Sequence, residues 1–134
     1  LLNIGPSPLG DYDPVAYDRL KGIGEWMKVN GDAIYATRPI EPYKEGNICF
    51  TITKGGAVNA IYLAAENENI MPATIAIKGI TPGKKAVITL LGAKGNLKWK
   101  TVNGTTTITI PDKLRKKPPC SCAWTFRISE VKQK

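Results

Sequence analysis

Histidine is absent from the 134 residues of this sequence, and its absence excludes several kinds of chemistry. A Ser-His-Asp triad, a histidine-ligated metal and an imidazole acid or base all need that side chain. Long apolar runs are also lacking, because charged residues make up 22 % of the chain and interrupt its hydrophobic stretches. We therefore expect no membrane span. The 43 % of apolar residues nevertheless indicates a globular chain rather than a disordered one.

Cysteine is scarce, and the thiols at Cys49, Cys120 and Cys122 match no common metal or disulfide framework. The spacing of Cys120 and Cys122 is not that of a Cys-x-x-Cys motif, and no histidine completes a zinc set. A bridge from Cys49 to one of the pair is open if their strands are neighbours, but we favour buried free thiols. We expect no metal site and no cofactor.

Acidic residues are few beside basic ones: 11 Asp and Glu against 19 Lys and Arg give a net charge of +8. The dense basic cluster consists of Lys113, Arg115, Lys116 and Lys117, just before two prolines. Such a cluster would suit a polyanion, yet no aromatic residues interleave with the charges as in single-strand nucleic-acid binders. We interpret the cluster as a solvated loop and expect no nucleic-acid partner.

The N-terminal segment predicts a strand, a loop and a helix. Residues 1–6 form an apolar run ended by Gly and Pro, which is typical of a buried strand. Asp13 followed by Pro14 indicates a helix start, and Asn30-Gly31 indicates its end. Apolar residues recur at helical spacing between these ends and form one stripe, made of Ala16, Leu20, Ile23 and Met27.

From Arg38 onwards the pattern changes to that of an antiparallel sheet. Residues 38–42 carry two prolines and predict a stiff connector between two domains, 1–38 and 39–134. Short alternating runs follow, with no helical period, at 47–54, 57–65, 73–78, 85–91, 97–102, 105–110 and 121–129. The predicted fold class is mainly β: an antiparallel β-sandwich of about seven or eight strands, preceded by one strand–helix unit.

The register of one hairpin follows from its turn. Asn103-Gly104 is a preferred pair for a two-residue type I′ turn. The register predicted from it pairs Val102 with Thr105, Lys100 with Thr107 and Trp99 with Ile108. Because side chains alternate along a strand, the Lys and Thr positions then share a wet face and Trp99 faces the core.

Aromatic residues make up only 7 % of the chain, and a tryptophan on a β-sandwich suggests a sugar-binding platform. The hairpin register places Trp99 in the core, and Trp124 alternates with Phe126 and Ile128 in a core pattern. Burying one indole removes on the order of 200 Å² from water, which a small sandwich needs. We therefore expect both tryptophans to be core residues.

A resemblance to a known family is carried by the N-terminal segment. Its residues are LNIGP at 2–6, Pro14, and RLKGIGEWMKVNGDAIYATRP at 19–39. They closely resemble the α-L-fucosidase family, glycoside hydrolase family 29, in which such a strand and helix close the catalytic (β/α)₈ barrel. The remainder resembles that family's C-terminal β-sandwich. Two departures are Pro8-Leu9-Gly10, where the family often has Asp-Gly, and the pair Cys120 and Cys122.

The resemblance implies that the parent protein is a retaining exo-glycosidase that releases terminal α-L-fucose from glycoconjugates. The family's Asp nucleophile, Glu acid/base and sugar-holding histidines lie upstream, so we expect no catalytic residue here. Retaining hydrolysis needs two carboxyls about 5 Å apart, and Glu66 and Glu68 lie among asparagines that indicate a loop. The candidates for bordering the parent's fucose pocket are Asn3 and the loop 5–12.

We therefore expect a non-catalytic C-terminal portion of an α-L-fucosidase, cut before Leu1 and inactive alone. Its expected partners are a fucosylated glycan, as substrate of the parent, and the rest of the barrel in cis, across the helix at 14–30. The resemblance implies a secreted, periplasmic or lysosomal location. The alternatives are an autonomous carbohydrate-binding module with an exposed aromatic such as Tyr43, and a basic scaffold that binds nucleic acid through Lys113–Lys117.

Overall fold

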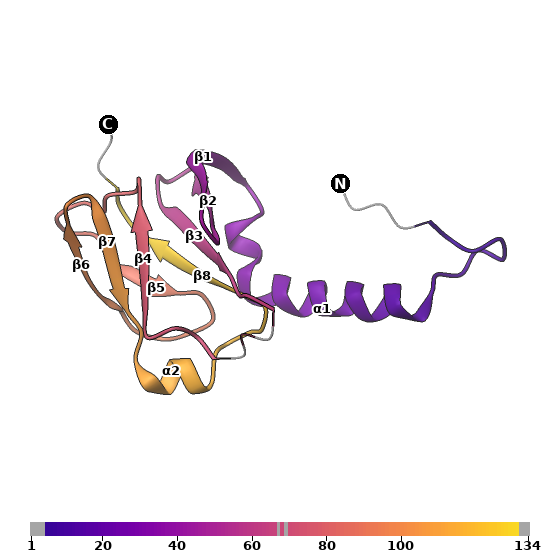
Figure 1. Ribbon diagram of the computed structural model, residues 1–134. Coiled ribbons are helices and arrows are strands. Elements are labelled where there is room, and N and C mark those ends of the chain that lie inside the picture. The colour runs from indigo at the N-terminus through magenta and orange to yellow at the C-terminus, as the bar shows by residue number, and fades with distance from the viewer. Residues whose placement is uncertain (1–4, 67, 69, 132–134) are drawn as a thin grey trace.

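A β-sandwich with one long helix beside it makes up the computed structural model, which describes residues 5–66, 68 and 70–131 (Figure 1). Residues 1–4, which include Asn3 and most of the predicted first strand, lie outside the described residues. Within the described residues, no helix is long and apolar enough to cross a membrane.

Helix α1 (Pro14–Asn30) begins and ends where the sequence predicts. The Asp13 carboxylate accepts a hydrogen bond from the backbone N–H of Val15 at 2.8 Å, and Pro14 occupies the first helical position. At the other end Gly31 stays in the right-handed region and starts a 3₁₀ turn, η1 (Gly31–Ala33). The helix therefore ends without a left-handed glycine cap.

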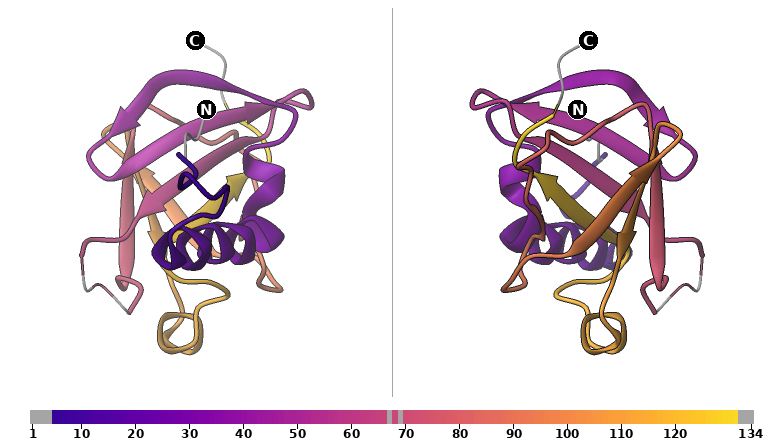
Figure 2. Two further views of the ribbon diagram at one scale, coloured as in Figure 1. Left: turned by 90° about the vertical axis from the view of Figure 1, so that its right-hand side faces the viewer. Right: turned by 90° about the vertical axis from the view of Figure 1, so that its left-hand side faces the viewer.

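Eight strands, counted over the described residues, form two antiparallel sheets. The five-stranded sheet has the order β1 (Thr37–Glu45), β2 (Ile48–Thr53), β3 (Val58–Leu63), β8 (Ala123–Ile128), β5 (Ile88–Leu90). The three-stranded sheet has the order β4 (Thr74–Lys78), β7 (Thr105–Thr109), β6 (Lys98–Val102) and lies on the side away from α1 (Figures 1 and 2). The predicted sandwich and its seven strands are confirmed, although β5 is shorter than 85–91.

Two segments differ from the prediction. Residues 38–42 are not a connector but part of the edge strand β1, which tolerates proline because one side of an edge needs no ladder hydrogen bond. The β1–β2 register shifts between Pro39 and Lys44. The basic cluster is not a loop either, since α2 (Asp112–Lys116) contains most of it. At five residues, α2 is too short to show an apolar period.

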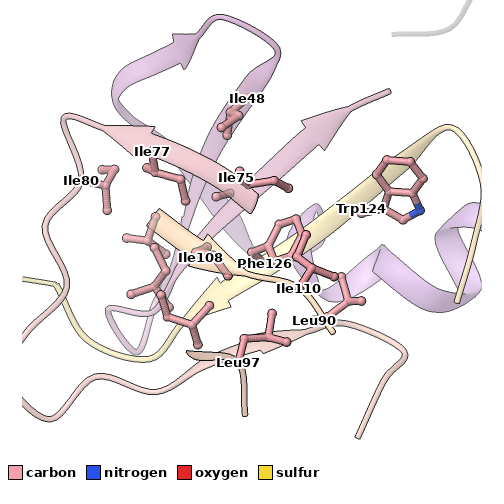
Figure 3. Close-up of a cluster of buried hydrophobic side chains, with 14 of the residues drawn as sticks. Ile48, Ile75, Ile77, Ile80, Leu90, Leu97, Ile108, Ile110, Trp124 and Phe126 are labelled. Carbon is pink, nitrogen blue, oxygen red and sulfur yellow. The ribbon is translucent and has the colours of Figure 1, made fainter. Parts of the chain in front are cut away.

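The hydrophobic core lies between the two sheets (Figure 3). Phe126 and Ile128 of β8 are fully buried, as are Ile77 and Ile108 of the smaller sheet. Trp124 is 1 % exposed, as predicted, and its indole N–H donates to the Cys120 carbonyl oxygen at 2.8 Å. The polar end of that ring is thus satisfied while its apolar body stabilises the core.

The β6–β7 hairpin has the predicted register. Trp99 pairs with Ile108 and Val102 with Thr105, and Trp99 is half-buried against the core. Gly104 at the turn has a φ of +75°. That left-handed conformation is the reason for glycine at this position.

Helix α1 projects from the sandwich and contacts it through its C-terminal part (Figure 1). The Trp26 indole N–H donates to the Ala123 carbonyl oxygen of β8 at 3.0 Å. Asn30 is fully buried, and its amide donates to the Trp26 carbonyl oxygen at 3.2 Å. By contrast Ile23, in the middle of the predicted stripe, remains 46 % exposed. The sandwich therefore leaves this part of the stripe uncovered, whereas Met27 at its end is half-buried.

A polar network fastens η1 to the outer face of the five-stranded sheet. Thr51 donates to the Ala33 carbonyl oxygen at 2.7 Å and accepts from the Asn59 amide at 3.1 Å. Arg127 donates through Nε to Asn59 Oδ1 at 2.9 Å and through a terminal nitrogen to the Asp32 carbonyl oxygen at 3.1 Å. Three neighbouring strands thus hold one short turn in place.

Replacing Trp26 with phenylalanine tests the attachment of α1. The variant loses one hydrogen bond, worth about 1 kcal/mol, so local opening should become about fivefold more frequent. Hydrogen exchange measured by mass spectrometry should be faster by that factor over residues 24–33 and unchanged in β3 and β8. Trp99→Phe is the matched control, because it shortens another half-buried ring away from α1. If both variants accelerate hydrogen exchange in residues 24–33 equally, the Trp26–Ala123 hydrogen bond is not what attaches α1.

Two glycine-to-alanine changes should have opposite signs. A Cβ at Gly104 or Gly22 meets nothing within 4 Å, so packing contributes to neither change. Gly104→Ala should lower the free energy of unfolding in urea by about 1 kcal/mol, because φ is positive there. Gly22→Ala, inside α1, should instead raise helicity at 222 nm, since alanine is favoured in a helix by about 1 kcal/mol. A stabilising Gly104→Ala would refute the turn geometry.

Candidate functional site

No cluster of three or more His, Cys, Asp and Glu that could hold a metal is found among the described residues.

The candidate carboxylates behave as loop residues, as predicted: Glu66 is exposed, and Glu68 accepts from the Ala65 backbone N–H at 2.8 Å. Both Glu68 oxygens also accept from the Tyr62 hydroxyl at 3.2 Å. Burial raises the pKa of Tyr62, so this phenol stays protonated and donates. The carboxylate thus closes a loop.

The three cysteines are free, but their burial is less complete than predicted. Cys49 and Cys120 are half-buried, and Cys122 is exposed because it lies in the turn before β8, with φ at +69°. The Cys120 thiol donates to the Ala123 carbonyl oxygen at 3.1 Å. Burial raises the pKa of Cys120, which keeps it a neutral thiol at pH 7 and a poor nucleophile.

The basic cluster is partly engaged in structure. Arg115 donates through Nε to the Met71 carbonyl oxygen at 3.0 Å and through a terminal nitrogen to Asp112 at 2.8 Å. These bonds tie α2 to the segment before β4. Lys113, Lys116 and Lys117 are exposed.

A groove of about 1440 Å³ lies between α1 and the outer face of the five-stranded sheet. Figure 1 shows that α1 meets the sandwich at the C-terminal end of the helix and extends away from it towards the N-terminus. We call this surface the α1 groove. Its walls include Leu20, Ile23, Trp26 and Val29 of α1, together with Cys49, Ile61 and Leu63 of β2 and β3 and Ala123 of β8.

The sheet side of the α1 groove is apolar because β3 has apolar residues on both faces. Ile61 pairs with Cys49 on β2, and Leu63 pairs with Ala123 on β8. Ile61 is 6 % exposed because η1 partly covers it, whereas Leu63 is 39 % exposed. The sequence contained a signal for this face: apart from Asn59, the run Val58–Leu63 is apolar or aromatic at both alternating sets of positions, which is typical of a strand buried on both faces.

The size and lining of the α1 groove favour a protein surface over a small molecule. Small-molecule sites measure about 300–1,000 Å³ and carry a few convergent polar groups. The α1 groove is larger and open, and the predicted stripe residues Ala16, Leu20 and Ile23 line it beside the apolar sheet. Charged residues such as Arg19, Lys21 and Lys28 line it as well, and apolar surface flanked by polar residues is typical of contacts with other protein.

Two protein families match separate parts of the chain. Residues 42–129 match the model of the alpha-L-fucosidase C-terminal domain, and residues 1–32 match that of alpha-L-fucosidase. The first match covers most of the sandwich. The second match covers α1, which forms one wall of the α1 groove.

Curated proteins match almost the whole chain. An alpha-L-fucosidase of Branchiostoma floridae is 35 % identical over 135 residues, covering 98 % of this chain and 29 % of that protein. The tissue alpha-L-fucosidase of Homo sapiens is 34 % identical, covering 98 % of this chain and 28 % of that protein. The chain therefore spans less than a third of the length of these relatives.

The fold recurs in solved structures. The Thermotoga maritima alpha-fucosidase in complex with a mechanism-based inhibitor superposes with a TM-score of 0.79 at 27 % identity, over 97 % of this chain and 30 % of that one. A GH29 alpha-L-fucosidase of Bacteroides thetaiotaomicron, at 21 % identity and a TM-score of 0.66, shares the fold. The chain belongs to the α-L-fucosidase family, and residues 42–129 form its C-terminal domain.

Proposed function

We propose that this chain is the non-catalytic C-terminal portion of an α-L-fucosidase, a retaining exo-glycosidase that releases terminal α-L-fucose from glycans. The observation that carries the proposal is the order of the two family matches, with 1–32 assigned to the α-L-fucosidase model and 42–129 to the C-terminal domain. Histidine is absent from the sequence, and the candidate carboxylate Glu68 is engaged by the Tyr62 hydroxyl and the Ala65 backbone N–H. Catalysis would therefore reside in the preceding barrel.

The α1 groove is the surface on which we place the catalytic domain in cis. Half-exposed Ile23 and the half-buried Leu20 line it, and both lie in the segment matched by the α-L-fucosidase model. Burying that apolar surface would stabilise the assembly by about 25 cal/mol per Å². The polar network around η1 would transmit this support, because it fixes α1 to three strands of the sandwich.

A domain boundary at 38/39 fits this assignment. The two family matches leave residues 33–41 between them. The chain leaves η1 in this interval and enters β1 at Thr37. We propose 1–38 as the end of the barrel and 39–134 as the sandwich, with Thr37 and Arg38 already paired to β2 as the first residues of β1. We also propose a secreted, periplasmic or lysosomal location, which is supported by a relative named plasma alpha-L-fucosidase in Homo sapiens, 30 % identical to this chain.

An activity assay tests the catalytic assignment. The 134-residue chain should not hydrolyse an aryl α-L-fucoside above background, whereas the full-length protein that contains it should. The physical reason is that the proposal places the two carboxylates that retaining hydrolysis needs, about 5 Å apart, in the preceding barrel. Turnover by the short chain, or none by the full-length protein, would contradict the proposal.

A charge placed in the α1 groove tests the docking surface. Ile23→Asp should destabilise the full-length protein by about 2 kcal/mol or more, because a carboxylate would be buried without a partner. In the 134-residue chain the same change should stay within about 0.5 kcal/mol, since Ile23 is 46 % exposed there. Thermal unfolding of both proteins measures the difference.

Val102→Asp is the matched control for this experiment. Val102 lies on β6, away from the α1 groove, and is 57 % exposed. The control should have little effect in either protein. If Ile23→Asp also leaves the full-length protein unchanged, the catalytic domain does not cover the groove.

A further inference from the structure

A second concave surface lies at the end of the sandwich opposite α2 (Figure 1). We call it the end cleft. It measures about 880 Å³, within the range of small-molecule sites. Its walls come from the bulged part of β1, the β2–β3 turn, and the segments that follow β4 and β8. None of these residues belongs to α1, so the end cleft is separate from the α1 groove.

Tyr43 lies at the end cleft in a strained conformation. Its φ is +63°, a left-handed value that costs a non-glycine residue about 1–2 kcal/mol. It lies in the segment where the β1–β2 register shifts, and such bulges re-aim side chains. The ring is 55 % exposed. Because strained backbone of this kind clusters at ligand-binding sites, the exposed Tyr43 ring is a candidate for contact with a ligand.

The cleft is held in shape from both sides. A Cβ at Gly79 would meet the Pro42 ring at 3.1 Å, so the end of β4 packs directly against the residue before Tyr43. On the other wall, a Cβ at Gly83 would meet Glu130 Oε1 at 2.6 Å, and the Gly83 N–H donates to the Glu130 carbonyl oxygen at 2.9 Å. Both glycines allow close approach, which pre-organises the site.

The polar groups of the end cleft are acceptors and hydroxyls. Glu41 and Glu130 contribute carboxylates and Thr81 contributes a hydroxyl, whereas the Ser129 hydroxyl, also in the lining, accepts from the Val87 backbone N–H at 2.9 Å. None of the described residues that line it is Lys or Arg, although basic residues exceed acidic ones by 19 to 11 in the chain. The charged groups among the described lining residues are therefore the carboxylates of Glu41 and Glu130. An aromatic ring beside acceptors and hydroxyls suits a ligand with apolar C–H faces and many O–H groups.

We propose that the end cleft binds a neutral oligosaccharide, with one sugar ring stacked on Tyr43 and its hydroxyl groups donating to Glu41 and Glu130. The Tyr43 hydroxyl lies 3.5 Å from Glu41 Oε1, so the ring and this acceptor adjoin each other. The proposal goes beyond the proposed function. It concerns the sandwich alone and does not require a catalytic barrel.

Titration of the 134-residue chain followed by ¹H–¹⁵N NMR tests the proposal. The probes are 2′-fucosyllactose and cellohexaose as neutral sugars, 3′-sialyllactose as an anionic sugar, and tetralysine as a basic peptide. At least one neutral sugar should shift the amide signals of Tyr43, Gly55, Gly56 and Gly79. The anionic sugar should bind more weakly than its neutral counterpart, because two carboxylates face it.

Three variants locate the binding. Tyr43→Asn removes the ring while tolerating the positive φ, and should raise the Kd at least about tenfold. Tyr43→Phe keeps the ring and should stay near the parent affinity. Tyr35→Ala is the matched control, because Tyr35 is 70 % exposed and lies outside the end cleft. Unchanged amide signals away from the cleft confirm that each variant is folded.

The outcomes separate the sugar from other occupants. Glu130→Gln keeps an acceptor and should retain sugar binding, but it should abolish any binding of tetralysine. The proposal is overturned if no neutral sugar at 10 mM (about a hundredfold above a 0.1 mM Kd) shifts the cleft signals. It is also overturned if Tyr43→Asn binds like the parent chain, or if tetralysine alone binds.

Discussion

The ladder between β3 and β8 is the interaction on which the rest of the structure depends. It pairs Val58–Leu63 with Ala123–Ile128 residue by residue. On one side of this ladder β8 supplies Phe126 to the core, and on the other it supplies Arg127 to the network that holds η1. Through Ala123 it also holds helix α1. Without this pairing, neither the sandwich nor the attachment of the helix would persist.

The five-stranded sheet has two apolar faces with different degrees of cover. Its inner face packs against the smaller sheet and is closed, whereas its outer face is covered only where η1 and the end of α1 lie on it. Because parts of β3 are apolar on both sides, one strand serves two hydrophobic surfaces. The α-L-fucosidase relatives are more than three times as long as this chain, and this open outer face is where we propose that the catalytic domain docks.

Local signals in the sequence predicted most of the elements. The α1 helix followed from Asp13 and Asn30, and the β6–β7 register followed from Gly104, because each depends on neighbours a few residues away. The edge strand β1 was not predicted, because its two prolines indicated a connector and its pairing with β2 forms only in the folded sheet. The end cleft could not be predicted from the sequence either. It joins Tyr43, already a candidate for contact with sugar, to Gly79 and Glu130, which meet only after the sheets assemble.

The late place of β8 in the chain has a consequence for biosynthesis. Strand β3 leaves the ribosome 60 residues before its partner, since Leu63 pairs with Ala123. At roughly 5–20 residues per second this delay lasts about 3–12 s. During it the edge of β3 that pairs with β8 has no partner, which is a condition under which nascent strands pair wrongly. A slow stretch of translation or a chaperone contact between β3 and β8 would bear directly on the yield of this domain.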